Sequence, residues 1–265
     1  MKFKIFTSCN CFDKWMIDSL LDSVITARRF VNRDDIELAF HAPLVNLDEI
    51  DERFSPYCNI NFYEDTLTTE FAIHPSQEGS SRWYGERLRV KNVKDKNVLL
   101  LDADTLVLKD PTHLFEGDFD FASCPKDTMP RHWQHTSNQR MRAKRVFKLP
   151  YDRTHIWGGP QIFKNNAHKK IGDEWLRVME KERHLMDICS SPNRKTYDQL
   201  SLTPAVARSD LKIKILKPWD DIFFRCSYAD VEDMRDTVTI AHGNDLIDKL
   251  GLRKEIEKLK NEIRE

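Results

Sequence analysis

Apolar and polar positions along the first 107 residues follow two different periods. Four runs have strand character, and they lie at residues 4–7, 36–41, 59–63 and 97–101. The segment 13–30 places its apolar residues on one stripe of a helix, and 82–93 is expected to be a second helix. The order strand, helix, strand, strand, helix, strand predicts an α/β domain with a largely parallel sheet. Ligands of such sheets bind at the carboxyl ends of the strands.

The second half of the chain continues this alternation with shorter runs. Strands are expected at 119–124, 156–163, 211–216 and 237–243, and helices at 171–185 and from Tyr197 onward. The tail from Leu246 is charged and amphipathic, and its apolar residues follow a 4-3-4 spacing at Leu252, Ile256, Leu259 and Ile263. Two heptads are too few for a coiled coil, so this helix is expected to pack on the domain or to support weak self-association. We therefore predict one domain at 1–245 and a helical extension at 246–265.

Two carboxylates follow the most apolar of these runs. Val98–Leu101 is apolar throughout, as in a strand buried on both faces, and Asp102 and Asp104 come directly after it. Alternate residues of a strand face the same way, so both carboxylates are expected on one side. Their charges repel unless a cation neutralises them, and a hard divalent ion such as Mg²⁺ or Mn²⁺ is the natural occupant. Acidic residues that simply cap a strand in solvent are the alternative.

The composition of the 265 residues is that of an ordinary globular protein, with 40% hydrophobic residues, 32% charged residues and a net charge of −1. This balance gives no general attraction to nucleic acid or to an anionic membrane. No apolar run has the length of a transmembrane helix, and the first residues lack the apolar core of a signal peptide. Six scattered cysteines without a C-x-x-C pair indicate reduced, buried thiols. We expect a cytoplasmic protein.

A basic and aromatic block lies at residues 131–153. It holds seven Lys or Arg residues against one acid, Asp152, and Trp133, Phe147 and Tyr151 are interspersed among them. Such a block can bind phosphate, an anionic acceptor or nucleic acid. Long loops of this kind are commonly lids, so we expect a lid over a diphosphate, with nucleic-acid binding as the alternative.

The segment 98–107 resembles the metal-binding segment of family 8 glycosyltransferases, the glycogenin-like retaining enzymes with a GT-A fold. The resemblance runs from about residue 3 to residue 243. It implies a Rossmann-like sheet flanked by helices and a D-x-D motif. It also implies metal-dependent transfer of a hexose or pentose from a UDP-sugar to an acceptor hydroxyl, with retention of anomeric configuration. The acceptor stays open among polysaccharide, protein, lipid and modified nucleic-acid base.

The resemblance also implies roles for residues on the donor side. The segment 6–12 is similar to the family's first strand and loop, so Thr7 and Ser8 would hold the uracil and Phe12 would stack on it. Arg87 would contact the sugar nucleotide, although Arg87 and Arg89 could instead pair with acids on the surface. In the D-x-D segment, Asp102, Ala103 and Asp104 would bind the nucleotide, and the two aspartates would also hold the metal.

Further roles fall in the second half of the chain. Asp198 and Gln199 match the family's D-Q pair beside the transferred sugar, although an Asp at a helix start is also favoured by the helix dipole. His242 would be the third metal ligand and favours Mn²⁺, because imidazole is a softer donor; a structural histidine is the alternative. The chain departs from the family at 157–159, where W-G-G replaces N-S-G, and after His242, where the lysine expected on the diphosphate is missing.

Two other function classes are compatible with parts of the sequence. A sugar-nucleotide nucleotidyltransferase shares this α/β architecture, but it requires a glycine-rich phosphate loop after the first strand. The segment 7–10 contains no glycine. A nucleic-acid-binding module would use the basic block at 131–153 and would bind with a steep dependence on salt.

Overall fold

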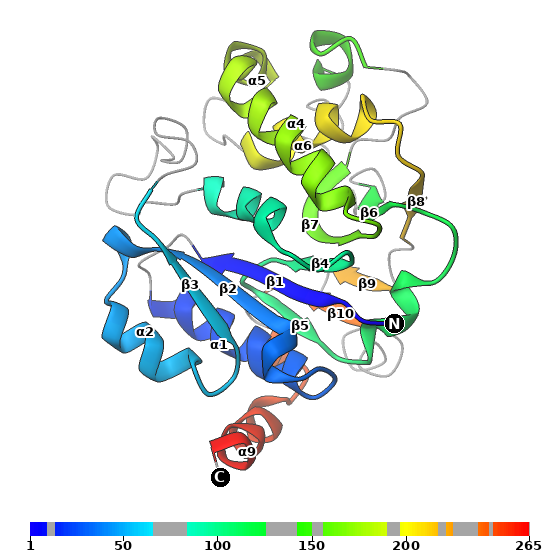
Figure 1. Cartoon of the computed structure of the whole chain (residues 1–265). Coiled ribbons are helices and arrows are strands. Elements are labelled where there is room, and N and C mark those ends of the chain that lie inside the picture. The colour runs from blue at the N-terminus through cyan, green and yellow to red at the C-terminus, as the bar shows by residue number, and fades with distance from the viewer. Residues whose placement is uncertain are drawn as a thin grey trace.

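The structure is a computed structural model, shown in Figure 1. It describes residues 1–9, 14–65, 84–125, 142–149, 156–189, 197–216, 221–224, 238–243 and 246–264. Phe12 and most of the basic block therefore lie outside the described residues.

A seven-stranded sheet forms the centre of the molecule, with strand order β3-β2-β1-β4-β7-β6-β8. Its strands are β1 (Lys4–Cys9), β2 (Ile36–His41), β3 (Asn59–Tyr63), β4 (Val98–Leu101), β6 (Phe121–Pro125), β7 (Ile156–Phe163) and β8 (Ile213–Ile215). Only β7 among them runs against its neighbours, so the prediction of a largely parallel sheet is confirmed. The chain first builds outward from β1 to β3 and then returns to β4 on the other side of β1. That reversal of order is where ligands of open α/β sheets bind.

A second sheet of three strands has the order β5-β10-β9. It contains β5 (Thr105–Val107), β9 (Ile222–Phe224) and β10 (Ile240–His242). The strand expected before the carboxylates is β4, which ends at Leu101 as predicted. The apolar residues after the carboxylates form a separate strand, β5, that the sequence did not predict.

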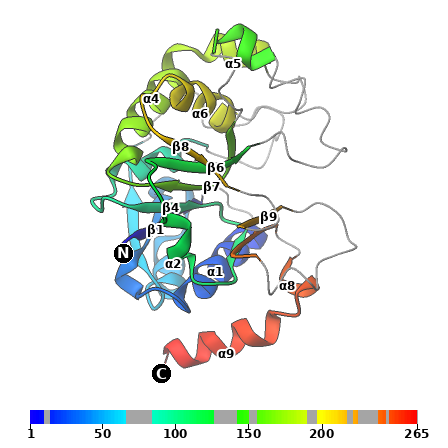
Figure 2. The same cartoon turned by 90° about the vertical axis from the view of Figure 1, so that its right-hand side faces the viewer.

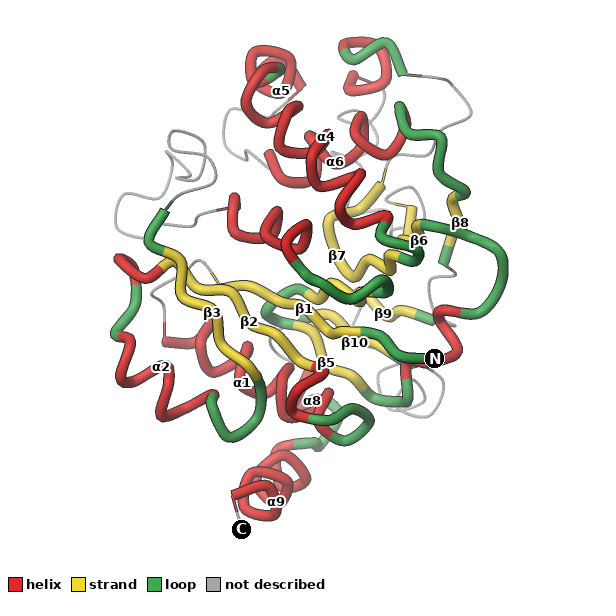
Figure 3. Tube along the Cα trace, viewed as in Figure 1, coloured by secondary structure: helices red, strands yellow, loops and turns green. Residues whose placement is uncertain are grey.

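Helices cover both faces of the central sheet, as Figures 2 and 3 show. One core cluster joins the sheet to α1 (Lys14–Arg28), α2 (Leu47–Phe54), α8 (Leu246–Lys249) and α9 (Arg253–Arg264). The opposite cluster joins it to η3 (Tyr84–Asn92), α4 (Ala167–Lys181), α5 (Arg183–Cys189) and α6 (Tyr197–Ala207). Three short 3-10 turns complete the described elements: η1 (Arg33–Asp35), η2 (Ala42–Leu44) and η4 (Pro111–Phe115).

Several predicted boundaries differ from the observed ones. The helix expected at 82–93 is a 3-10 helix at 84–92, and the one expected at 171–185 breaks at Glu182 into α4 and α5. The strands expected at 119–124 and 211–216 are shorter, because β6 starts at Phe121 and β8 covers three residues. Sequence reasoning also missed α2, which begins at a local cap where Asn46 accepts a hydrogen bond from the Glu49 amide (3.3 Å).

The C-terminal tail packs on the chain itself. A break at Gly251, with φ of 63°, separates α8 from α9, so the single helix expected from Leu246 is two. Ile256 is buried, Leu259 and Ile263 pack against the core cluster that contains α1, and Glu255 pairs with Arg29 (2.9 Å). The apolar stripe of the tail therefore contributes to the core.

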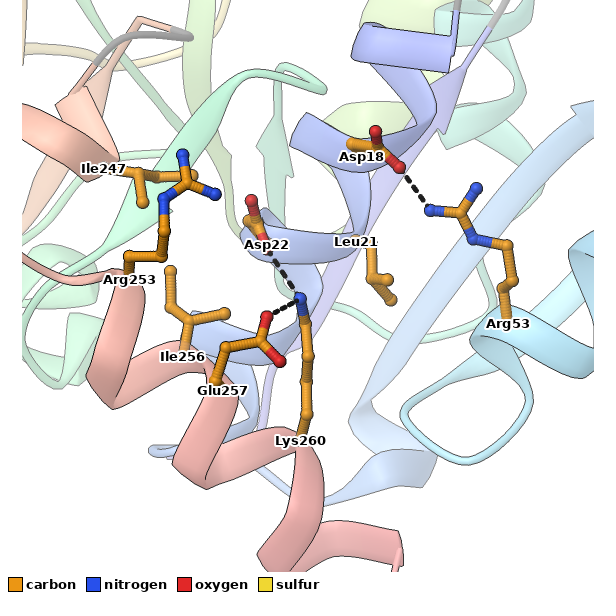
Figure 4. A pocket seen from close by; sticks show the side chains of 9 residues that line it. All are labelled: Asp18, Leu21, Asp22, Arg53, Ile247, Arg253, Ile256, Glu257 and Lys260. Carbon is orange, nitrogen blue, oxygen red and sulfur yellow. Dashed lines mark hydrogen bonds and ion pairs between the residues drawn. The ribbon is translucent and has the colours of Figure 1, made fainter.

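A cavity of about 220 Å³ lies between α9, α1 and α2, as shown in Figure 4. Its charges pair across the helices. Lys260 lies 3.4 Å from Asp22 and 2.8 Å from Glu257, and Arg53 pairs with Asp18. Burial raises the pKa of Asp22 above its ordinary value, and Lys260 partly opposes that effect. Across this cavity the Lys260–Asp22 pair thus joins α9 to α1, and the Arg53–Asp18 pair joins α2 to α1.

Four cysteines, Cys9, Cys58, Cys124 and Cys189, are buried free thiols, as the scattered positions predicted. Burial raises the pKa of Cys58 to about 12, which keeps this thiol protonated and unreactive. In the part of the chain that is described, no helix has the length and apolar character needed to cross a membrane.

The last part of the basic block is folded rather than loose. Residues 142–146 are helical, and Ala143, Phe147 and Leu149 are buried in the core cluster that contains α4 and α6. Arg208, which directly follows α6, also donates to the carbonyl oxygen of Phe147 (3.5 Å). The rest of the block, which is expected to form a lid over the diphosphate, lies outside the described residues.

Candidate metal centre

The turn between β4 and β5 carries the two carboxylates of the D-x-D motif. Thr105 closes this turn on the Asp102 carbonyl oxygen, through its amide (3.3 Å) and its hydroxyl (2.7 Å). Asp102 and Asp104 therefore share a side because a turn brings them together. The alternation of a strand, from which the sequence predicted the same outcome, is not the cause.

His242 reaches the carboxylates through the register of the second sheet. Strand β10 pairs antiparallel with β5 and sets His242 opposite Thr105. The amide of Gly243 donates to the Asp104 carbonyl oxygen (2.8 Å) and fixes the end of β10 beside the turn. As a result, His242 Nε2 lies 3.0 Å from Asp104 Oδ1 and 3.3 Å from Asp102 Oδ2.

These three side chains fit a divalent cation. One ligand atom from each lies within 4.8 Å of the others, and this is the one such group of ligands among the residues described. An octahedral ion with bonds of about 2.1 Å separates neighbouring donors by about 3 Å. The two distances from His242 match that spacing, and two carboxylate oxygens with one imidazole nitrogen suit Mn²⁺ or Mg²⁺.

The charges of this centre are strongly coupled. Burial alone would lower the pKa of His242, but Asp104 and Asp102 together raise it to about 10. Burial alone would raise the pKa of Asp104, yet the His242 cation lowers it below its ordinary value. Arg87 forms an ion pair with Asp102 on the other oxygen, Oδ1. The centre thus holds two carboxylates between two cations, and a metal ion would take the place of the proton on His242.

Helix α1 supports the carboxylate turn through hydrogen bonds to the residues that follow it. Ser23 Oγ lies 3.4 Å from Thr105 Oγ1, and Thr26 Oγ1 accepts a hydrogen bond from the Val107 amide (3.1 Å). All three hydroxyl-bearing residues are buried. Sequence reasoning missed these residues, since nothing in the helical stripe of α1 distinguishes a hydroxyl that contacts β5 from one that faces solvent.

The carboxyl end of β1 lies next to the centre. Thr7 pairs with Leu101 of β4, so Ser8 stands one step further along, at the level of Asp102. The hydroxyls of Thr7 and Ser8 are buried and have no hydrogen-bond partner among the described residues. A buried hydroxyl left this way costs about 1–3 kcal/mol. Both hydroxyls are therefore suited to a ligand that brings its own polar groups.

The structure gives the backbone position of the remaining predicted residues, but not every side chain. Ala103 lies in the carboxylate turn and packs against the core cluster that contains α1. Asp198 and Gln199 belong to the first turn of α6, but the description does not extend to their side chains. Gly158 and Gly159 lie inside β7, the strand antiparallel to β4.

No family model matches this sequence, and no curated protein matches it. Solved structures do match the fold. The galactosyltransferase LgtC in complex with donor and acceptor sugar analogs has a TM-score of 0.62 and 13% identity, over 98% of this chain and 96% of LgtC. Mouse xyloside xylosyltransferase 1 has a TM-score of 0.52 and 11% identity, over 92% of this chain and 98% of that one.

A third similarity is to the bifunctional glycosyltransferase WbbM, with a TM-score of 0.58 and 13% identity. It covers 97% of this chain but 51% of WbbM, so the present chain spans about half of that protein. At these identities the similarities show the fold. The chain has the GT-A glycosyltransferase fold, with a mostly parallel sheet between helices and an Asp-Asp-His cluster.

Proposed function

We propose that the chain is a metal-dependent glycosyltransferase that moves a hexose or pentose from a UDP-sugar to an acceptor hydroxyl, with retention of configuration. One observation carries this proposal. Asp102, Asp104 and His242 meet at metal-ligand spacing beside the ends of β1 and β4, where the strand order of the sheet reverses.

The leaving group explains why such a centre is needed. A nucleoside diphosphate departs with additional negative charge. Asp102, Asp104 and His242 would hold a divalent ion, which would supply the positive charge that stabilises this leaving group. Arg87 stands beside this position, and its guanidinium suits the diphosphate oxygens. Imidazole as one of three ligands favours Mn²⁺ over Mg²⁺.

The donor nucleoside would occupy the carboxyl end of β1. The buried hydroxyls of Thr7 and Ser8 are available there to its polar atoms, Phe12 would stack on the base, and Ala103 would contact the nucleotide from the carboxylate turn. These roles rest on position and on the resemblance of the sequence to family 8.

Asp198 and Gln199 are the residues proposed beside the transferred sugar. Asp198 would hold sugar hydroxyls, and the side-chain carbonyl of Gln199 would face the anomeric carbon. A structure of LgtC with a TM-score of 0.60 and 13% identity is of an active-site mutant in which a glutamine is replaced by glutamate; the choice of Gln199 in this chain rests on the resemblance of the sequence to family 8. Charge stabilisation at an oxocarbenium-like centre is the chemistry that retention requires.

Turnover of a panel of nucleotide sugars in the presence of Mn²⁺ tests the proposal and names the donor. We expect release of UDP from at least one UDP-sugar, abolished by Asp104→Asn with the fold intact and unaffected by Asp248→Asn, which changes an exposed carboxylate of α8. The proposal is wrong if no nucleotide sugar gives either turnover or thermal stabilisation. Neither the described residues nor the comparisons support a nucleotidyltransferase or a nucleic-acid-binding module.

A further inference from the structure

The 3-10 helix η3 connects the ends of two strands of the central sheet, β3 and β4, that are not neighbours. It covers nine residues, 84–92, whereas 3-10 helices longer than three or four residues are uncommon. Leu88 and Val90 are fully buried and belong to the core cluster that contains α4 and α6. Such a helix requires specific contacts on several sides, because its own hydrogen bonds are poorly aligned.

Arg89 makes the contacts on the side that faces β3. Its side chain is 2% exposed, which is unusual for a charged residue. The guanidinium carbon lies 3.8 Å from the centre of the Tyr63 ring, at the end of β3. The same guanidinium donates to the Asp65 carbonyl oxygen and lies 3.4 Å from the Asp65 carboxylate. Arg89 thereby ties η3 to the last residue of β3 and to the chain that follows it.

Arg87 stands two residues earlier and points another way. Three residues make a turn of a 3-10 helix, so side chains two apart diverge by about 120°. Arg87 meets Asp102 after β4, while Arg89 meets Tyr63 at the end of β3. Strands β2 and β1 lie between β3 and β4. The helix η3 therefore spans the carboxyl ends of these strands, where the donor would bind.

The far end of η3 is fixed against α4. Lys91 pairs with Asp173 (2.7 Å), and His168 Nε2 contacts the Val93 carbonyl oxygen (3.0 Å). These contacts hold the helix at the face of α4, and Arg89 holds it at β3. The position of Arg87 at the carboxyl ends of the strands depends on the contacts with α4 and on the contact of Arg89 with β3.

We propose that Arg89 is a positioning residue: it anchors η3 to the end of β3 and so sets where the Arg87 guanidinium meets Asp102. Its effect on the metal and the donor rests on the proposed function. Its effect on the position of Arg87 does not rest on the proposed function, because the Arg87–Asp102 ion pair needs neither a metal nor a donor.

The consequence for metal binding follows from charge. Arg87 places a positive charge next to a proposed ligand, and two cations repel. Removing that charge with Arg87→Met should tighten Mn²⁺ binding by about threefold or more. Arg89→Met should shift the Mn²⁺ affinity in the same direction, because a displaced Arg87 no longer faces Asp102. The double variant should match Arg87→Met, since Arg89 acts through Arg87.

The experiment measures free Mn²⁺ by electron paramagnetic resonance in wild type, Arg87→Met, Arg89→Met, the double variant and Arg253→Met. The last is a matched control, because Arg253 pairs with Asp248 near α9, away from η3. A full, independent effect of Arg89→Met on top of Arg87→Met would overturn the proposal, and so would an unchanged affinity in Arg89→Met.

A metal-independent readout separates this proposal from the proposed function. The Arg87 Nε–H resonance is assigned in ¹⁵N–¹H spectra by its loss in Arg87→Met. We expect this resonance to move in Arg89→Met, and to move less in Arg89→Lys, which keeps the charge but loses the planar stacking. If Arg89→Met fails to fold, Tyr63→Leu removes the ring from the other side and should move the same resonance.

The outcomes are distinct. An Arg87 resonance that stays in place in Arg89→Met, or in Tyr63→Leu, contradicts the positioning role whatever the metal does. A wild-type protein that binds no Mn²⁺ contradicts the proposed function, and the resonance then decides the role of Arg89 alone.

Discussion

Thr105 shows how one buried hydroxyl can hold a metal site in shape. Its side chain joins the Asp102 carbonyl oxygen to Ser23 of α1 and is fully buried. Thr105→Val keeps the volume but removes both hydrogen bonds. We expect a loss of about 1–3 kcal/mol in the free energy of unfolding, together with weaker Mn²⁺ binding.

Urea unfolding and Mn²⁺ titration check this expectation. Thr112→Val is the matched control, because the hydroxyl of Thr112 in η4 donates to the carboxylate of Asp110, the residue before η4, away from the centre. It should change stability without changing the Mn²⁺ affinity. A normal affinity in Thr105→Val would show that the turn keeps its shape without the hydroxyl.

His168 makes the stability of the protein depend on pH. It is fully buried, and burial lowers its pKa below the ordinary 6.5 even though Nε2 donates to the Val93 carbonyl oxygen. Below pH 6.5 the unfolded chain takes up a proton that the folded chain resists. The stability from a neutral His168 is therefore complete above pH 6.5 and is lost as the pH falls through 6.5 toward the folded pKa.

His168→Gln keeps a donor but cannot titrate. The free energy of unfolding, measured by urea between pH 5 and pH 8, should fall less steeply below pH 6.5 in this variant than in wild type. Carboxylates elsewhere contribute equally to both proteins. Parallel curves for the two would contradict a buried, neutral His168.

Roles of single residues were only partly predictable from the sequence. Asp102 and Asp104 stand out as charges after an apolar strand, and the structure brings His242 to them as the resemblance led us to expect. Arg89 did not stand out, because its partners Tyr63 and Asp65 lie more than 20 residues away along the chain. A contact of that kind is a property of the fold.

At the scale of elements, the close approach of α4 to η3 depends on Gly172. A Cβ added there would lie 2.6 Å from Lys91 Cβ. Gly172→Ala gains about 1 kcal/mol of helix propensity, but the clash costs about 1–3 kcal/mol. We expect a net loss of stability and, because η3 carries Arg87, a changed Mn²⁺ affinity.

Thermal and urea unfolding of Gly172→Ala measure this balance, with Glu180→Ala on the exposed side of α4 as the control. The control should lie within about 0.5 kcal/mol of wild type. A stabilised Gly172→Ala would mean that η3 moves away from α4 at no cost.

Elements with a clear period were predicted well, and those defined by distant pairing were not. Strands β1, β2 and β3 and helix α1 follow their apolar patterns closely. The division between β4 and β5 was hidden, because β5 pairs with β10, more than 100 residues later. The 3-10 character of η3 was hidden too, since it depends on contacts with distant residues such as Tyr63 and Asp173.

At the scale of the whole molecule, α9 is part of the core that supports α1 and, through it, the carboxylate turn. Ile256 is 3% exposed, so Ile256→Ala should lower the free energy of unfolding by about 2–4 kcal/mol. Ile263→Ala, at a partly buried position, should cost less. Equal, small effects would contradict docking of α9 on the domain.

The same unfolding experiment distinguishes packing on the domain from self-association through this helix. A helix docked within its own chain gives a melting temperature that does not change with protein concentration. A tail that acts by association would give a melting temperature that rises with concentration. We expect no dependence.

Binding of UDP with and without Mn²⁺ tests the central claim most directly, namely that Asp102, Asp104 and His242 hold a metal that receives the diphosphate. Calorimetric titration of wild type should show UDP binding in Mn²⁺ that weakens at least about tenfold when the metal is chelated. Asp104→Asn should lose the same metal-dependent part, and Asp248→Asn should keep it. UDP binding that is equally tight with and without Mn²⁺, or unchanged in Asp104→Asn, would contradict the account.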